Sequence, residues 1–305
     1  IELWYNSAMM DNLNLTGKVA IITGGTRGFG LAVARAYAQE GATVVIASRS
    51  PAAVEAAVDS LRAAGARASG WACDVGDLAQ VEALAASAVE TFGPFHVWVN
   101  NAGIAGPYGP TAHVPPGAFA RVLQTNVFGV YHGSLVAMRH FVPRGSGKLI
   151  NVLGQGSQRP TPLQNAYASS KAWVRHFTLA LAKEYQDSGV GVFTLHPGLM
   201  QTDLTCKIEA VSGYEARLRP FETVIRMWAK SPDVPARKAV WLASPATDGR
   251  TGLEVKVSTT GHLLRGAVRE GWRRLTRRPA PPVELTVETV PAALPTPPAG
   301  GADTS

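Results

Sequence analysis

Tyr167 and Lys171 have the residue types and the spacing for proton transfer to or from an oxygen atom. They stand four residues apart in the sequence YASSK, so on a helix they share one face and act on one ligand. A phenol with an ordinary pKa of about 10 is a poor acid or base at neutral pH, but a fixed ammonium group close by favours the phenolate. Without further motifs, a half-buried aromatic residue on an amphipathic helix is the simpler interpretation of Tyr167.

A glycine-rich segment, TGGTRGFG at 23–30, directly follows a short apolar run and opens a helix-like stretch. Its glycines at 24, 28 and 30 permit a tight turn, a close approach of the backbone to a pyrophosphate, and close packing of a helix on a strand. The N–H groups at the start of that helix would point at the anion. The segment predicts a dinucleotide site; the alternative is a glycine-rich turn that binds no ligand.

Short β-branched runs alternate with helix-length segments from residue 18 onward, and this alternation must position both motifs. The runs are VAIIT at 19–23, TVVIA at 43–47, HVWVN at 96–100, KLINV at 148–152 and GVFTL at 191–195. The helix-length segments are 28–40, 51–64, 77–92 and 165–188. The rhythm predicts right-handed crossovers and strands buried on both faces. We expect one α/β domain over 11–260, with a doubly wound Rossmann-type parallel sheet.

The alternation weakens after about residue 200. Residues 203–230 read as helical pieces without a strand, and an insertion at this point is expected to form a lid over the site. A helix at 232–244 and a strand at 253–257 follow. The lid is rich in apolar side chains, which favours a lipophilic or aromatic carbonyl substrate, with Tyr214 as a candidate contact. The alternative is that these side chains only pack the lid onto the body.

The spacing TGxxxGxG resembles that of the short-chain dehydrogenase/reductase family, and further motifs of that family occur in order downstream. These are Asn100-Asn101-Ala102-Gly103 at the end of the 96–100 run, Asn126 in the next helix, Tyr167-Ala168-Ser169-Ser170-Lys171, and Pro197-Gly198 after the 191–195 run. The resemblance covers roughly residues 14–258. It implies a hydride transfer between a nicotinamide and a carbonyl or alcohol group.

The resemblance also assigns roles to single residues. It implies that Tyr167 exchanges a proton with the substrate oxygen, that Lys171 also bonds the nicotinamide ribose, and that Asn126 holds a water of a proton relay. The residues it implies around the cofactor are Gly24, Thr26, Arg27, Gly28, Phe29, Gly30, Ser48, Arg49, Asp74, Val75, Asn101, Ala102, Gly103, Tyr167, Lys171, Pro197, Gly198, Met200 and Thr202.

One position departs from the family pattern. The serine that normally orients the carbonyl lies 13 residues before the tyrosine, and here that position is Gly154. Three explanations are open: Gln155 or Ser157 supplies the hydrogen bond, the substrate brings its own polar group, or the protein no longer catalyses the usual reaction. Loss of one preorganised donor at a developing oxyanion typically costs about 100- to 1,000-fold in rate, so a slow enzyme is compatible with Gly154.

The residues at the end of the second strand bear on the choice of cofactor. NAD-binding relatives place an acidic residue there, whereas this chain has Ser48 followed by Arg49, and Arg27 lies within the glycine loop. Two guanidinium groups and no carboxylate favour the 2′-phosphate of NADP(H). The alternative is that both arginines are solvated surface charges.

The net charge of +7 comes mainly from one segment. Residues 261–278 hold six arginines and one glutamate, a charge of +5, so the rest of the chain carries only +2. Apolar residues recur at helical intervals among these arginines, which predicts a basic amphipathic helix over 261–278 that lies on an anionic membrane or on a partner. The alternative is a solvated helix packed weakly on its own domain. A nucleic-acid partner is not expected, because the body is nearly neutral.

Other classes are disfavoured by composition and spacing. Neither HExxH nor any other tight ligand spacing occurs among the seven histidines, so we expect no metal; without a GxSxG motif, hydrolysis is disfavoured. Two cysteines exclude a disulfide framework. Residues 1–10 are interpreted as a leader or expression remnant, and 279–305 as a proline-rich disordered tail. We expect a cytoplasmic protein, peripheral at a membrane if the basic helix docks there.

Two functions from different classes follow. The first is an NADP(H)-dependent oxidoreductase acting on a small carbonyl or alcohol, assembled by resemblance as a homodimer or homotetramer through helices at about 115–142 and 165–188. The second is an NADP-binding regulator or scaffold with weak or no catalysis, which Gly154 favours. The intact Asn126, Tyr167 and Lys171 favour the enzyme, because a binding protein has little need of a proton relay.

Overall fold

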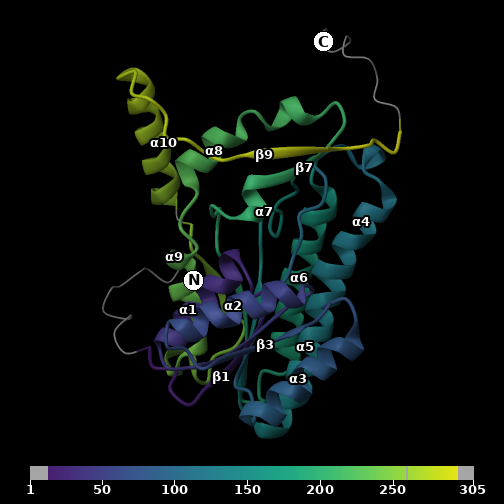
Figure 1. Ribbon diagram of the computed structural model, residues 1–305, viewed down its shortest axis with the longest axis vertical. Helices are drawn as coiled ribbons and strands as arrows, with labels where there is room; N and C mark the ends of the chain where they lie inside the picture. The colour runs from purple at the N-terminus through teal and green to yellow at the C-terminus, as the bar shows by residue number, and fades with distance from the viewer. Residues whose placement is uncertain (1–12, 259, 295–305) are drawn as a thin grey trace.

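Figure 1 shows the computed structural model of the chain, which describes residues 13–258 and 260–294. Its centre is a parallel sheet of seven strands in the order β3-β2-β1-β4-β5-β6-β8. The strands are β1 Val19–Thr23, β2 Thr43–Ser48, β3 Ala68–Ala72, β4 Val97–Asn100, β5 Gly147–Val152, β6 Val190–His196 and β8 Glu254–Lys256. The strand order reverses between β1 and β4, which confirms the doubly wound arrangement and places a crevice at the carboxyl ends of these strands.

Helices cover both faces of the main sheet, and others build the lid and the segment after β8. The α-helices of the described residues are α1 Gly28–Gln39, α2 Pro51–Ala63, α3 Leu78–Phe92, α4 Pro116–Leu123, α5 Gly129–Phe141, α6 Asn165–Glu184, α7 Asp203–Cys206, α8 Phe221–Trp228, α9 Asp233–Ala243 and α10 Thr260–Leu275. Successive residues of a strand point to opposite faces. Ala20 and Ile22 of β1 therefore pack in a core with α1, α2 and α9, whereas Val19 and Ile21 pack with α3, α5 and α6.

Short polar signals fix where the helices begin. Ser50 precedes α2 and its hydroxyl accepts a hydrogen bond from the N–H of Ala53 at 3.3 Å. Asp77 precedes α3 and its carboxylate accepts one from the N–H of Ala79 at 2.9 Å. Such caps stabilise a helix by about 1 kcal/mol each. They set the direction in which each helix leaves the end of its strand, and so the shape of the crevice.

The lid, residues 203–230, is not built of helical pieces alone, so that part of the sequence prediction is wrong. A strand, β7 Lys207–Val211, lies between α7 and α8 and pairs in parallel with β9 Thr286–Val290. The two strands form a separate small sheet beside the main one (Figure 1). A five-residue strand in an otherwise helical lid is stabilised by its partner, which lies far away in the sequence.

The prediction that residues 279–305 form a disordered tail is also wrong in part, because Thr286–Val290 form the strand β9. The prolines flank this strand at 282 and 291 and leave its N–H groups free to pair, and four of its five residues are threonine or valine. The last part of the predicted tail, 295–305, and the predicted leader, 1–10, lie outside the described residues.

Two small apolar cores join the lid, the chain end and the loop after β4. One holds Ile208, Ala210 and Leu218 of the lid with Tyr108, Phe221, Leu285 and Val287. The other holds Val114, Ala118 and Val211 with Phe119, Tyr214, Val290 and Ala292. The lid is therefore packed between two segments from distant parts of the chain. Among the described residues, no helix has the length and apolar content needed to cross a bilayer.

Candidate active site

Tyr167 and Lys171 lie one turn apart near the start of α6, with the Lys171 ammonium 5.8 Å from the centre of the Tyr167 ring. Lys171 is buried, and its Nζ donates a hydrogen bond to the Val152 carbonyl at the end of β5, at 3.0 Å. Burial lowers the pKa of Lys171 to about 8. Burial also raises the pKa of Tyr167 to about 12, so in this structure desolvation outweighs the acidifying effect that the sequence argument expects from Lys171.

Gly154 lies directly against the Tyr167 hydroxyl. A Cβ atom on residue 154 would stand 2.1 Å from the Tyr167 Oη and 2.9 Å from its Cζ, which is closer than any real contact. The tyrosine side chain thus occupies the space that a side chain at 154 would need. Any side chain at position 154 would therefore collide with Tyr167 in its present position.

The turn after Gly154 separates the two residues that were predicted to replace the serine. The Ser157 N–H donates to the Gly154 carbonyl at 3.2 Å, and a Cβ on Gly156 would meet the α6 backbone at Ala168, so the turn packs tightly on α6. Ser157 is buried within this turn, whereas Gln155 is exposed. In the described part of the chain, the Ser157 hydroxyl has no recorded hydrogen-bond partner.

Asn126 is buried in a π-helical segment, Gln124–Phe128, which interrupts the path from α4 to α5. Its Oδ1 accepts from the Ile104 N–H at 2.9 Å, and its Nδ2 donates to the Ile104 carbonyl and to the Ser170 Oγ, both at 3.0 Å. The side chain therefore ties the loop after β4 to α6. Both of its N–H donors are occupied, whereas its Oδ1 accepts one hydrogen bond and keeps a second acceptor position.

The glycine loop is folded tightly against the loop that follows β4. Gly24 has a φ of +65°, and a Cβ on it would lie 2.8 Å from the Cα of Ala102. The Asn101 amide donates to the carbonyls of Thr23 and Gly24, each at 3.0 Å. Asn101 thus braces the loop, and the role that the structure gives its side chain is positional.

The start of α1 is open to an anion. Arg27 precedes this helix in extended conformation without a side-chain cap, and there is no acidic residue in the first turn. The described residues therefore leave N–H groups of the first turn directed at the crevice. Gly28 has a φ of +54° and faces Thr202, whose Cβ would be 3.5 Å from a Cβ at 28. Thr26, Phe29 and Gly30 complete this turn.

The Arg27 side chain is exposed and forms an ion pair with the lid. Its guanidinium pairs with the Asp203 carboxylate at 2.9 Å, with both side chains largely exposed. Arg49 is exposed immediately after Ser48 at the end of β2. The sequence singled out both arginines, but it gave no sign of the contact between the glycine loop and the lid.

The segments that follow β3 and β6 complete the edge of the crevice. Asp74 accepts a hydrogen bond from the Gly76 N–H at 2.9 Å, and the Val75 carbonyl lies 2.9 Å from His132 Nδ1. Pro197 and Gly198 follow β6, Met200 bridges to Lys230 in the lid, and Thr202 caps α7. The fold thus brings every predicted cofactor residue to the carboxyl edge of the sheet.

His196 is a residue that the sequence reasoning missed. Its Nδ1 accepts from the Gly198 N–H at 3.2 Å, and a hydrogen bond with the main chain of Gly154 opposes the fall in its pKa that burial causes. It thereby links the turn after β5 to the turn after β6. Its position directly before Pro197 was the available signal.

The substrate side is built by the lid and by the chain end together. Tyr108 pairs through its backbone with Glu209 and Val211 of the β7 segment, at 2.8 and 2.9 Å. Tyr214 packs edge-on against His113 at 5.6 Å between ring centres, in the small core that also holds Val290. Tyr214 therefore packs the lid, as the alternative interpretation expected. No group of three or more His, Cys, Asp or Glu side chains suited to a metal ion occurs among the described residues.

Comparison with known proteins places this geometry in a family. The family profile of short chain dehydrogenases matches residues 18–212, and the later lid, α10 and β9 lie beyond it. The chain is 34% identical over 242 residues to the 4-formylbenzenesulfonate dehydrogenase TsaC1/TsaC2 of Comamonas testosteroni, covering 79% of this chain and 96% of that protein. It is 35% identical to the 3beta-hydroxysteroid dehydrogenase 1 of Eggerthella lenta, covering 78% and 91%.

Solved structures agree. Actinorhodin polyketide ketoreductase with NADPH superposes with a TM-score of 0.73 at 29% identity, over 81% of this chain and 97% of that one. The 3-ketoacyl-(acyl-carrier-protein) reductase of Brucella melitensis, complexed with NADH, gives a TM-score of 0.72 at 33% identity, over 80% and 98%. The chain belongs to the short-chain dehydrogenase family, whose members are oxidoreductases that bind a nicotinamide dinucleotide and act on small molecules with CH–OH or C=O groups.

Proposed function

We propose that this chain is an NADP(H)-dependent reductase of a lipophilic or aromatic carbonyl compound, which also oxidises the corresponding alcohol. The observation that carries the proposal is the pair of a half-buried Tyr167 and a buried Lys171 at the carboxyl ends of the strands, beside Gly154. Reduction is the favoured direction because cells keep the NADP pool largely reduced.

The site fits a dinucleotide. The uncapped start of α1 offers N–H groups to a pyrophosphate, as argued above. The Lys171 ammonium has three donors, of which the structure commits one, to Val152 within the described chain, so two remain for ribose hydroxyls. When bound, the dinucleotide supplies the hydride at C4 of its nicotinamide.

The chain's own residues handle the proton. A Tyr167 pKa of about 12 keeps the phenol protonated at neutral pH, so its Oη–H donates to the substrate oxygen as that oxygen gains negative charge. Lys171, with a pKa of about 8, is mostly a cation at neutral pH and stabilises the phenolate left behind. Asn126 is the proposed holder of the water through which the phenolate regains its proton.

Ser157 is the proposed replacement for the missing serine. It is the buried member of the pair, its hydroxyl is uncommitted to the described residues, and its turn is fixed on α6. Exposed Gln155 is the matched control. We expect Ser157→Ala to lower kcat about 100-fold, the usual cost of removing one preorganised donor, whereas Gln155→Ala leaves kcat nearly unchanged. The reverse ranking would assign the role to Gln155, and no effect of either would favour a polar group on the substrate.

The relatives support the substrate class. One is named for an aromatic aldehyde and another for a steroid. In this chain, the lid contributes apolar residues to two small cores beside the main sheet. Apolar groups of this kind suit a lipophilic or aromatic carbonyl compound.

The preference for NADP(H) rests on Arg27 and Arg49 and on the absence of a carboxylate at the end of β2. A charge-assisted hydrogen bond contributes about 1.5–3 kcal/mol, so Arg49→Ala is expected to weaken NADPH binding about 10- to 100-fold and leave NADH binding unchanged. Arg35→Ala, at an exposed position on α1, is the matched control. Equal binding of NADH and NADPH by the unmodified chain would refute the assignment.

We propose a homo-oligomer formed through α5 and α6. Phe128, Tyr131 and Trp173 are exposed to 48, 42 and 37%, and Trp173 stacks on Phe177 at 4.7 Å. A contiguous aromatic patch on two neighbouring helices is typical of a subunit interface. Sedimentation velocity on the unmodified chain and on Tyr131→Glu, which should dissociate, tests it.

The test of the function is NADPH oxidation, followed by absorbance, with aromatic and lipophilic ketones and aldehydes. Turnover that Tyr167→Phe abolishes supports the reductase. Tight NADPH binding without turnover across the panel would support the second candidate, an NADP-binding regulator, which Gly154 favours.

A further inference from the structure

The helix α10 turns its polar face toward the protein and its apolar face toward solvent. Gly266 and Glu270 are buried. The opposite face carries an outer stripe, defined as Leu264, Val268, Trp272 and Leu275, which are exposed to 66, 65, 62 and 76%. A helix that only stabilises its own domain packs its apolar face inward. The outer stripe is therefore not explained by the packing of this chain.

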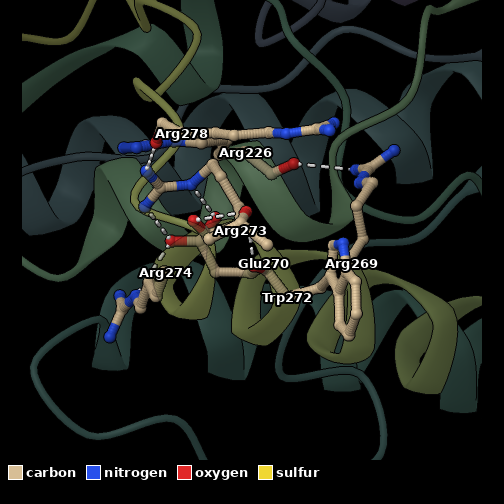
Figure 2. A network of polar contacts seen from close by, with 8 residues as sticks. Arg226, Arg269, Glu270, Trp272, Arg273, Arg274 and Arg278 are labelled. Carbon is tan, nitrogen blue, oxygen red and sulfur yellow. Dashed lines mark hydrogen bonds and ion pairs between the residues drawn. The ribbon is translucent and has the colours of Figure 1, made fainter.

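Polar contacts hold α10 in that orientation on α8. A Cβ on Gly266 would lie 2.3 Å from the Met227 carbonyl, so the two backbones approach closely. The Trp228 Nε1 donates to the Leu263 carbonyl at 3.0 Å. Arg269 donates to the Arg226 carbonyl, also at 3.0 Å (Figure 2). These bonds fix the rotation of the helix and keep the outer stripe exposed.

The charged residues of α10 and of the segment after it also differ in exposure, with the acidic residue buried and Arg265 and Arg277 exposed. Its one acidic residue, Glu270, is buried between Arg273 and Arg274, at 2.7 and 3.0 Å, which hold its pKa down to about 2 (Figure 2). The guanidinium groups of Arg265 and Arg277 have no recorded partner in the described part of the chain. The exposed side of this segment therefore presents apolar and positively charged groups together.

We propose that α10 docks on the surface of an anionic lipid bilayer, with the outer stripe at the interface and the arginines against the headgroups. The combination of an apolar stripe containing a tryptophan with flanking arginines suits that surface. A second copy of the chain would bring two arginine-rich rims together and is disfavoured by charge. Helix α10 also lies at the edge of the molecule, beyond α8, where a flat surface can reach it (Figure 1).

The experiment is sedimentation of the full chain with vesicles of phosphatidylcholine alone or mixed with phosphatidylglycerol. We expect binding to the anionic vesicles only, weakened by added salt. Arg265→Gln with Arg277→Gln should weaken binding about fivefold per arginine. Leu264→Ser with Trp272→Ser should abolish it. The matched controls, Arg35→Gln and Val234→Ser, alter exposed side chains on α1 and α9 and should bind as the unmodified chain does.

A second measurement does not depend on the folding of those variants. Brominated phosphatidylglycerol vesicles should quench part of the tryptophan fluorescence of the unmodified chain, and Trp272→Phe should remove that part while binding persists. No sedimentation with anionic vesicles at low salt overturns the proposal. So does a lipid-free oligomer that the stripe variants dissociate, because a second copy would then cover the stripe.

Discussion

The hydroxyl of Tyr167 stands where the first side-chain atom of residue 154 would be, 2.1 Å from an ideal Cβ on Gly154. The two residues form one unit, in which the glycine allows the tyrosine to lie against the end of β5. Restoring the family's serine at 154 is therefore a steric change as well as a chemical one.

We expect Gly154→Ser to lower kcat/KM for carbonyl reduction by about 100-fold, because the Tyr167 hydroxyl must move by an ångström or more from its position. Gly154→Ala separates the two effects, since it adds the bulk without the hydroxyl and should be at least as slow. Steady-state kinetics on both variants check this. A higher kcat/KM in Gly154→Ser than in the unmodified chain would contradict this expectation, because Tyr167 would then have moved without loss of rate.

The rate of reduction should depend on pH through Lys171. Because burial lowers its pKa from 10.5 to about 8, the ammonium is present below that pH and is lost above it. Tyr167, with a pKa of about 12, stays protonated across the same range. We therefore expect kcat for reduction to fall as pH rises through about 8.

Lys171→Arg is the control for that profile. A guanidinium group does not titrate in this range, so the alkaline fall should disappear even where the absolute rate is lower. An unchanged midpoint in this variant would assign the titration to another group.

If Arg27 binds the 2′-phosphate as proposed, its ion pair with Asp203 competes with that contact. The pair is exposed, and such pairs are worth only about 0.2–1 kcal/mol, so Asp203→Asn should tighten NADPH binding by up to about fivefold. NADH lacks the 2′-phosphate, so its affinity should not change. Fluorescence titration with both nucleotides measures this. Weaker NADPH binding in the variant would mean that Asp203 orients Arg27 for the phosphate.

Ending the chain after residue 284 removes β9, and we expect the lid to loosen. The loss of even one half-buried valine at about 1.5 kcal/mol corresponds to roughly a tenfold rise in KM for the carbonyl substrate. Nucleotide affinity should be unaffected, because β9 does not touch the crevice residues described above. Hydrogen exchange should show lost protection over 207–211. A chain ending after 294 keeps β9 and is the matched control; equal protection in both would show that β7 is stable alone.

The sequence predicted the parallel sheet and its flanking helices well because these depend on local patterns. Runs such as VAIIT can lie only in the interior, and the glycines at 24, 28 and 30 directly follow one of them. The predictions failed where a distant partner decides the structure. Strand β9 pairs with residues far earlier in the chain, and Arg27 meets Asp203 across 176 positions.

Gly154 shows a second limit of prediction from the sequence. Its identity is visible in the sequence, but its contact with the tyrosine hydroxyl depends on how β5 and α6 pack. The direction in which the Tyr167 pKa moves likewise depends on burial, which a spacing of four residues does not reveal.

The pairing of β7 with β9 also has a consequence for how the protein is made. A ribosome releases residues 207–211 long before 286–290. The nucleotide-binding half can fold while synthesis continues, since its strands are complete early. The lid must wait until residues 286–290 have been synthesised. A nascent chain stalled before that point would hold a folded crevice and an unfinished lid, and is the species most exposed to proteases.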